Sequence, residues 1–118
     1  MPLEVRVARV YSEPTAADGE RVLVDRLWPR GLRKDDPRVG TWFPDAAPST
    51  ALRRWYGHDP ARFEEFARRY RDELDEAPDA VEQLRTRAAG GTLTLTTATA
   101  DVERSAAAVL VEVLRVRG

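Results

Sequence analysis

Residues 22–34 read VLVDRLWPRGLRK, so three apolar residues are followed at once by a cluster of cations. The run Val22–Val24 is typical of a short central strand in a parallel sheet, which is buried on both faces. A core has no use for the cations that follow it, Arg26, Arg30, Arg33 and Lys34, which surround a Trp-Pro turn. Guanidinium groups on a short loop suit carboxylate or phosphate oxygens. The stretch therefore predicts an α/β domain with an anion site where this strand ends.

Two further strands are predicted, one before and one after this segment. Residues 3–7 alternate apolar and charged side chains, and residues 92–97 combine alternation with β-branching. The connector of residues 11–20 is too short for an ordinary helical crossover and contains Pro14 and an Asp-Gly turn signal. A hairpin would fit this connector, so the relative direction of the first two strands stays open.

Four helices are predicted after the basic loop. Their expected starts are the N-cap Ser49, the pair Asp59-Pro60, Pro78 and the N-cap Asp101. Gly57 stands where the first of them should end in the left-handed conformation. An apolar stripe over residues 106–114 predicts that the last helix packs on the core.

The composition limits the class of protein. A chain of 118 residues can form one domain with a substantial core. The absence of cysteine excludes a disulfide, a thiolate nucleophile and a Cys-ligated metal, and it favours a reducing compartment. The first residues lack the apolar segment of a signal peptide, and no stretch approaches the roughly 20 apolar residues of a membrane span. We therefore expect a cytoplasmic protein without a membrane partner.

The charges argue against a globally basic nucleic-acid binder, because the formal net charge is -1. Between Asp25 and His58, however, seven basic side chains face four acidic ones, which gives a modest local positive excess. The single histidine and the scattered aspartates lack the spacing of a metal site. We therefore expect no metal and no other cofactor, and a small anionic ligand is favoured over nucleic acid.

Two blocks of the sequence resemble a known family. The first block is Asp18-Gly19 followed by residues 21–31, RVLVDRLWPRG. The second block comprises residues 47–50 (APST), 52–53 (LR) and 55–60 (WYGHDP), then Phe66, Tyr70 and Glu73-Leu74. Both blocks are similar to signatures of the short, YeaO-like branch of the DUF488 family, whose name records that its function is unknown. The resemblance implies one α/β domain over residues 1–118, with three or four mostly parallel strands flanked by helices.

Near the last strand, the chain departs from the family pattern. The pattern has an aromatic residue, a lysine and an asparagine where this sequence has Thr97, Ala100 and Ser105, and only Asp101 is kept. The missing lysine removes an ammonium group from the proposed anion site. This departure favours a changed ligand or a purely binding role.

The candidate site follows from the expected architecture. Ligands of open α/β sheets bind beyond the carboxyl ends of the strands. The loop after residues 22–24 and the loop after residues 92–97 would share one crevice if their strands are parallel neighbours, and the second block could close over it. The candidate catalytic residues are His58, Asp25 and Asp101, and the candidate substrate-binding residues are Arg26, Arg30, Arg53, Ser49 and Trp28.

Each of these residues also has a structural interpretation. Asp25 and Arg26 could form a buried ion pair, and Ser49 and Asp101 could act only as N-caps. Trp28 could be a packed ring, and the ring of His58 could bond a backbone carbonyl. Of the neighbouring pair Arg53 and Arg54, one should face solvent, and the family signature favours Arg53 as the ligand contact.

Three functions fit these observations. The first is a small enzyme for a phosphorylated or nucleotide-like substrate, in which arginines clamp the anion and His58 moves a proton. The second is a non-catalytic module that binds a nucleotide or single-stranded nucleic acid. The third is an interaction protein with an Arg/Trp surface, whose oligomeric state the sequence leaves open. The isolated histidine between two cap signals gives a slight preference for the enzyme.

Overall fold

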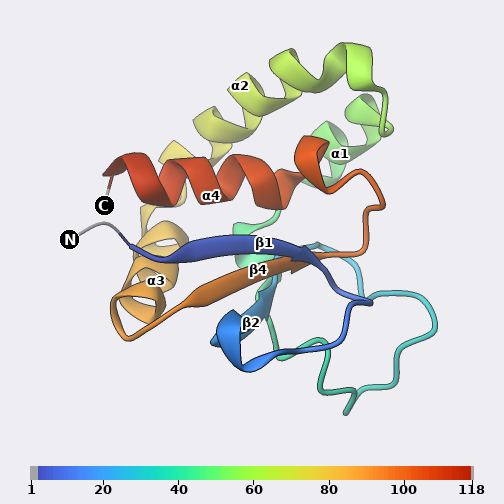
Figure 1. The fold of residues 1–118 in the computed structure, drawn as a ribbon. Helices are drawn as coiled ribbons and strands as arrows, with labels where there is room; N and C mark the ends of the chain where they lie inside the picture. Colours follow the sequence, from blue (N-terminus) through green and yellow to red (C-terminus); the bar gives the residue numbers. More distant parts are fainter. Residues whose placement is uncertain (1–2, 118) are drawn as a thin grey trace.

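A four-stranded parallel sheet forms the centre of the computed structural model, which describes residues 3–117 (Figure 1). The strands are β1 (Val5–Arg9), β2 (Glu20–Leu23), β3 (Thr41–Trp42) and β4 (Leu93–Thr97). Their order is β1-β4-β2-β3, and every neighbouring pair is parallel. The α/β fold class is therefore confirmed. The short edge strand β3 was not predicted, because two residues carry no periodicity.

The hairpin alternative for the first two strands is wrong, because β4 lies between β1 and β2. Val5 pairs with Leu93 on one side of β4, and Val22 pairs with Leu95 on the other. All five residues of β4 are buried, as expected for the central strand of a parallel sheet. The connector between β1 and β2 contains only a short 3-10 helix, Ala16–Asp18, and no α-helix.

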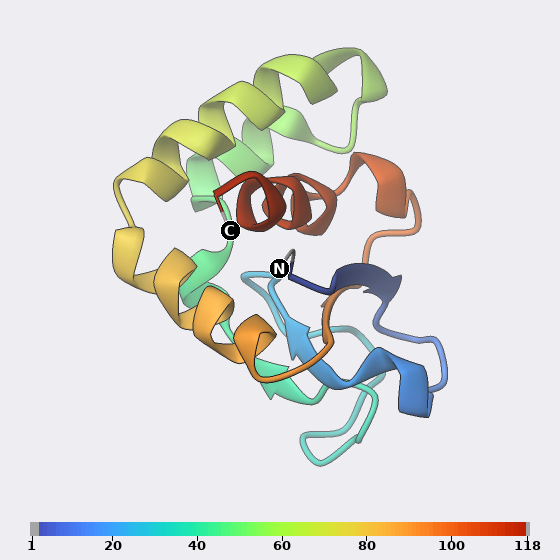
Figure 2. The same cartoon turned by 60° about the vertical axis from the view of Figure 1, so that its left-hand side comes forward.

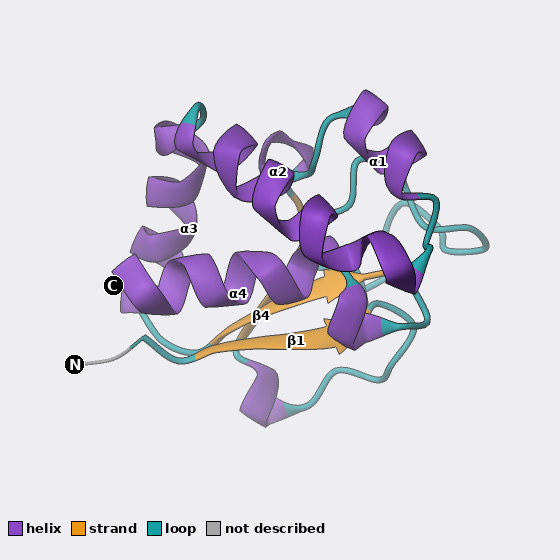
Figure 3. Cartoon of the chain, turned by 90° about the horizontal axis from the view of Figure 1, so that it is seen from above, coloured by secondary structure: helices purple, strands orange, loops and turns teal. Residues whose placement is uncertain are grey.

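The α-helices gather on one face of the sheet (Figures 1 and 3). They are α1 (Thr50–Tyr56), α2 (Phe63–Asp75), α3 (Pro78–Ala89) and α4 (Ala106–Arg117). Figure 2 shows α2 and α3 curving around α4, which lies directly on the sheet. Within residues 3–117, no helix combines the length and apolar character needed to cross a bilayer.

The helix signals were mostly right. Ser49 caps α1 by accepting a hydrogen bond from Leu52 N, and Gly57 ends it at φ 54°. The expected cap at Asp101 is wrong for α4. Asp101 instead precedes a short 3-10 helix, Val102–Arg104, and its side chain makes no cap bond. Ser105 starts α4, because its Oγ accepts from Ala108 N at 3.2 Å.

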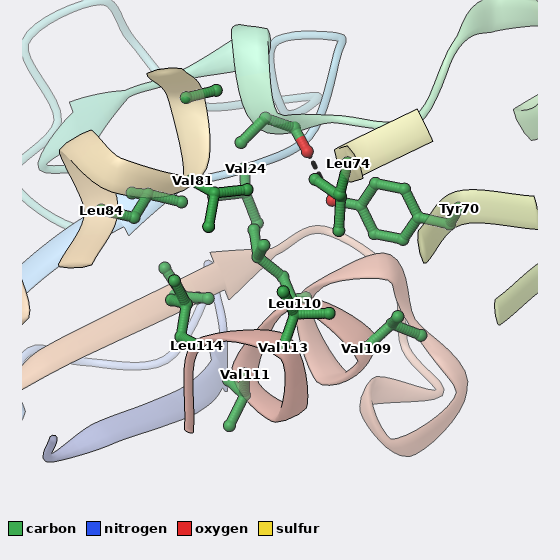
Figure 4. Packing of buried hydrophobic residues seen from close by; sticks show 14 of the residues in the cluster. Val24, Tyr70, Leu74, Val81, Leu84, Val109, Leu110, Val111, Val113 and Leu114 are labelled. Carbon is green, nitrogen blue, oxygen red and sulfur yellow. Dashed lines mark hydrogen bonds between the residues drawn. The ribbon is translucent and has the colours of Figure 1, made fainter. Parts of the chain in front are cut away.

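Two apolar clusters cover the two faces of the sheet. The larger one lies between the sheet and the helices and includes Val24, Leu84 and Leu110 (Figure 4). Within it, the hydroxyl of Tyr70 donates to the carbonyl of Ala46, and burial raises the Tyr70 pKa above its usual range. The smaller cluster lies around Leu23 and is covered by residues of the loop between β2 and β3. A helix layer on one face and a loop on the other therefore enclose the sheet.

Two glycines let neighbouring strands start side by side. Gly19 directly precedes β2 at φ 62°, and Gly40 precedes β3 at φ 67°. A Cβ on Gly19 would lie 2.1 Å from the carbonyl oxygen of Thr92, and a Cβ on Gly40 would lie 2.2 Å from that of Arg21. Both the positive φ and the close approach therefore require glycine.

Candidate functional site

A cavity of about 480 Å³ lies beyond the carboxyl ends of β1, β2 and β4. In Figures 1 and 3, this is the end of the sheet toward which the strand arrows point and near which α1 lies. The strand ends, α1, α2 and the start of α4 all contribute side chains to the cavity wall. Its position agrees with the general rule for ligand sites of open parallel sheets.

Positive charge dominates the wall of this cavity. Its acidic and basic side chains are Asp25, Arg26, Arg30, Arg53, His58 and Arg104. Four guanidinium groups and one imidazole therefore surround one carboxylate. Apolar and aromatic side chains complete the wall, among them Tyr11, Leu27, Trp28 and Tyr56. Polar groups that converge among apolar and aromatic side chains are typical of small-ligand sites.

Asp25 is held in a fixed orientation by β4. Its Oδ1 accepts from Thr97 Oγ1 and its Oδ2 from Ala98 N, both at 2.8 Å. Burial raises the pKa of the Asp25 carboxyl above its usual 3.8, whereas these two hydrogen bonds and the neighbouring His58 and Arg53 favour the charged form. The carboxylate is thus partly desolvated, and residues at the end of β4, far away in the sequence, hold its orientation.

Arg26 ties the loop after β2 to the segment before α1. Its Nε donates to the carbonyl of Pro48 at 2.9 Å, and its Nη2 donates to the carbonyl of Ala47 at 3.3 Å. Arg26 and Asp25 form no ion pair with each other in the described structure, so that structural interpretation is not supported. Arg26 lines the cavity while part of its guanidinium is already used by the backbone.

Arg53 and Arg54 are neighbours on α1 that lie in different surroundings. Arg53 is half-buried and lines the cavity, whereas Arg54 is exposed. The Nε of Arg53 is buried and donates to no acceptor in the part of the chain that the structure describes. Buried donors in folded proteins almost always have a partner, so an orphaned guanidinium nitrogen in a cavity wall needs an explanation.

His58 lines the cavity from an unusual backbone conformation. It follows Gly57 with φ 58°, so two successive residues are left-handed after α1. Such backbone is uncommon for a residue with a side chain and occurs often at functional sites. The ring lies 6.2 Å from that of Tyr56, and within residues 3–117 it makes no hydrogen bond to a backbone carbonyl.

Trp28 and Arg30 reach the cavity from the loop after β2. The Trp28 Nε1 donates to the carbonyl of Leu32 at 2.8 Å, and its ring packs edge-on against Trp42 with centroids 5.6 Å apart. Arg30 is exposed, and its carbonyl accepts from the hydroxyl of Tyr11 at 2.9 Å. The Trp28 ring is therefore held in place, while the Arg30 side chain is open to solvent.

Two predicted site residues are not among the side chains that line the cavity. Ser49 caps α1, and both its backbone N and its Oγ donate to the carboxylate of Glu73, at 2.8 and 2.6 Å. Asp101 is exposed and pairs with Arg104 at 3.0 Å. The structure thus brings Asp25 and His58 to the cavity but leaves Asp101 outside its wall.

The sequence prediction missed Tyr11 and Arg104, which line the cavity. Tyr11 follows the end of β1, so the strand-end rule would have found it had the direction of β1 been known. Arg104 precedes the start of α4 in a segment that resembled the first turn of a helix. Within residues 3–117, no group of three His, Asp or Glu side chains lies close enough to hold a metal ion.

Comparison with known proteins assigns the chain to a family. A family model described as the inactive DUF488-N3 subclade matches residues 4–117. The chain belongs to the DUF488 family. The expected YeaO-like relationship is also confirmed: this DUF488 chain is 33% identical to the uncharacterised protein YeaO of Escherichia coli over 113 residues, covering 96% of this chain and 98% of YeaO.

Uncharacterised mycobacterial proteins are more similar. The chain is 54% identical over 113 residues to protein Rv3073c of Mycobacterium tuberculosis, covering 96% of this chain and 95% of that protein. The Mycobacterium bovis protein Mb3100c gives the same identity and coverage. No solved structure matches the chain.

Proposed function

We propose that this DUF488 protein is a non-catalytic module that binds a small organic anion in the cavity beyond the parallel strands. The observation that carries the proposal is the charge of the wall, where Asp25 is the one carboxylate beside four arginines, of which only Arg104 forms an ion pair within the described residues. Arg53 supports it, because its side chain lines the cavity without a hydrogen bond or ion pair to any described residue, and its terminal nitrogens, unlike the buried Nε, are left to bind an anionic oxygen.

Two observations favour binding over catalysis. Asp101, one of the three candidate catalytic residues, pairs with Arg104 and does not line the cavity. The subclade to which the chain belongs is described as inactive. An arrangement of arginines needs no reacting group in order to hold an anion.

The test is a calorimetric titration with inorganic phosphate, nucleotides, sugar phosphates and dicarboxylates. Arg53→Ala is the informative variant, and Arg54→Ala is its matched control, because it removes the same charge from the same helix on the exposed side. We expect Arg53→Ala to weaken anion binding about tenfold or more, and Arg54→Ala to leave it nearly unchanged. Equal losses in both variants, or no binding by wild type, would contradict the proposal.

A second candidate, an enzyme for a phosphorylated substrate, is favoured by His58. Its left-handed backbone and its place in the cavity wall beside Asp25 suit a proton-transfer group. This function requires turnover of a bound phosphate ester that His58→Ala abolishes while affinity is kept. If wild type binds the phosphate ester without turning it over, the enzyme hypothesis is excluded and the non-catalytic module is supported.

A further inference from the structure

The cavity contains one carboxylate that a simple anion site does not need. Asp25 lies among four arginines, yet it forms no ion pair with any residue that the structure describes. A bare anion such as phosphate would be repelled by this carboxylate, which weakens the site for that ligand. The position of Asp25 therefore carries information about the ligand.

Asp25 keeps the capacity to accept further hydrogen bonds. Thr97 Oγ1 occupies one acceptor position on Oδ1, and Ala98 N occupies one on Oδ2. An ionised carboxylate has about four acceptor positions, so both oxygens can accept again. The two donors also fix the plane of the group, which prevents it from turning toward a guanidinium.

Arg53 shows the complementary feature in the same cavity. Arg53 makes no hydrogen bond or ion pair with a described residue, and Asp25 forms no ion pair, although Arg53 and His58 lie near enough for their charges to favour the ionised carboxylate. A ligand that joins an anionic oxygen to nearby hydroxyl donors would satisfy both groups. Ribose phosphates, like other sugar phosphates, carry vicinal hydroxyls on the same molecule as a phosphate.

An apolar lip stands beside these polar groups. Leu27, Trp28 and Pro29 line the cavity, and Leu27 is 58% exposed. The fixed Trp28 ring and the exposed Leu27 side chain offer a surface on which a planar base could lie. A cavity of about 480 Å³ is within the usual range for ligands of this size.

We infer that the ligand is a nucleoside monophosphate, with its phosphate among the arginines, its ribose hydroxyls on Asp25 and its base on the Leu27–Pro29 lip. This inference rests on the proposed anion-binding function and adds the class of ligand. Asp25 becomes the residue that determines specificity, because it favours a hydroxylated anion over a bare one.

The experiment compares four probes by calorimetry on the unaltered protein: inorganic phosphate, ribose 5-phosphate, adenosine 5′-monophosphate and its 2′,3′-dideoxy analogue. We expect the monophosphate to bind about tenfold to hundredfold more tightly than the dideoxy analogue, since hydrogen bonds to a charged group are lost. Ribose 5-phosphate and phosphate should bind more weakly than the monophosphate.

Asp25→Asn tests the residue itself. The preference for the hydroxylated nucleotide should fall to about threefold or less in this variant, because a neutral amide accepts hydrogen bonds more weakly than a carboxylate. Asp45→Asn is the control, since Asp45 is an exposed carboxyl that does not line the cavity.

The outcomes separate this inference from the proposed function. Equal affinity of wild type for the nucleotide and its dideoxy analogue, with both lost in Arg53→Ala, would overturn the role of Asp25 while keeping the anion site. Ribose 5-phosphate binding as tightly as the nucleotide would overturn the assignment of a base. Failure of every probe to bind would overturn both.

Discussion

At the scale of single residues, Arg21 joins the connection between β1 and β2 to the connection between β2 and β3. It is 5% exposed, and its guanidinium donates to the carbonyls of Arg38, Val10 and Ser12 and to the carboxylate of Asp18. A buried cation of this kind is tolerated because its donors are so fully used. Its role is structural, although it belongs to the same sequence block as the cavity residues Arg26 and Arg30.

Replacing Arg21 by Met should therefore destabilise the fold. The carbonyls that it satisfies would lose their donor, and we expect the free energy of unfolding to fall by about 3 kcal/mol or more. Urea denaturation measures this change. Arg54→Met is the control, because Arg54 is exposed on α1. Similar losses in the two variants would show that Arg21 makes no special contribution.

Asp25 should impose a pH dependence opposite to that of most carboxyls. Because burial raises its pKa, the folded state binds the proton more tightly than the unfolded state, whose pKa lies near 3.8. The contribution of Asp25 to the free energy of unfolding should therefore fall as the pH rises from 3.8 through the raised pKa.

The measurement is the stability difference between wild type and Asp25→Asn at a series of pH values from acidic to neutral. Subtraction removes the contributions of other carboxyls, such as Glu65, whose hydrogen bonds with Arg68 and Arg69 lower its pKa to about 2. Wild type should lose stability relative to the variant as the pH rises. A difference that is constant or grows with pH would mean that the folded-state pKa of Asp25 is not raised.

At the scale of elements, Ser49 joins the start of α1 to α2. It caps α1 at Leu52 N and makes two further hydrogen bonds to Glu73. Ser49→Ala should cost about 2 kcal/mol of unfolding free energy, from the lost cap and the lost bond to a charged group. It should leave ligand affinity nearly unchanged, because Ser49 does not line the cavity.

Denaturation and calorimetry on Ser49→Ala check the two halves of this prediction. Glu73→Gln gives a matched comparison, since it weakens the same contact from the other helix and should reproduce part of the stability loss. A large loss of affinity in a folded Ser49→Ala protein would return Ser49 to the binding site that the sequence suggested.

The strand starts offer a second test at this scale. Gly40→Ala should destabilise the protein more than Gly31→Ala, although both glycines have positive φ. A Cβ at Gly40 meets a backbone carbonyl at 2.2 Å, whereas one at Gly31 meets nothing within 4 Å. The Gly31 variant should lose about 1 to 2 kcal/mol from backbone strain alone. Equal losses in urea denaturation would show that the β2–β3 approach tolerates a methyl group.

At the scale of the whole molecule, positive charge is local. The net charge is -1, although four arginines line one cavity. Tight binding of a long polyanion requires many phosphate contacts along an extended basic surface. The molecule therefore suits a single anionic group better than a nucleic-acid strand.

A short single-stranded RNA should accordingly bind no more tightly than the mononucleotide of the same base. Fluorescence anisotropy with a labelled oligonucleotide, competed by the mononucleotide, makes the comparison. Much tighter RNA binding with a steep dependence on salt would favour a nucleic-acid module instead.

The sequence by itself determined the local elements, because their signals lie within a few residues. Alternation marked β1 and β4, an apolar run marked β2, and the cap signals at Ser49 and Gly57 set the limits of α1. The end of the sheet at which the candidate site lies could also be predicted, because cations directly follow β2. The cavity residues that directly follow β2 could therefore be predicted from the sequence.

Only the tertiary structure decided which strands are neighbours and which side chains contact one another. The insertion of β4 between β1 and β2 pairs Leu93 with Val5, 88 residues earlier, and with Glu20, 73 residues earlier. The pairing with β2 gives Asp25 its partners Thr97 and Ala98. The fold also gives two arginines different surroundings, since Arg21 donates to backbone carbonyls while Arg53 makes no hydrogen bond with a described residue. Periodicity and caps are local properties, whereas burial and hydrogen-bond satisfaction depend on neighbours that the chain brings together only when it folds.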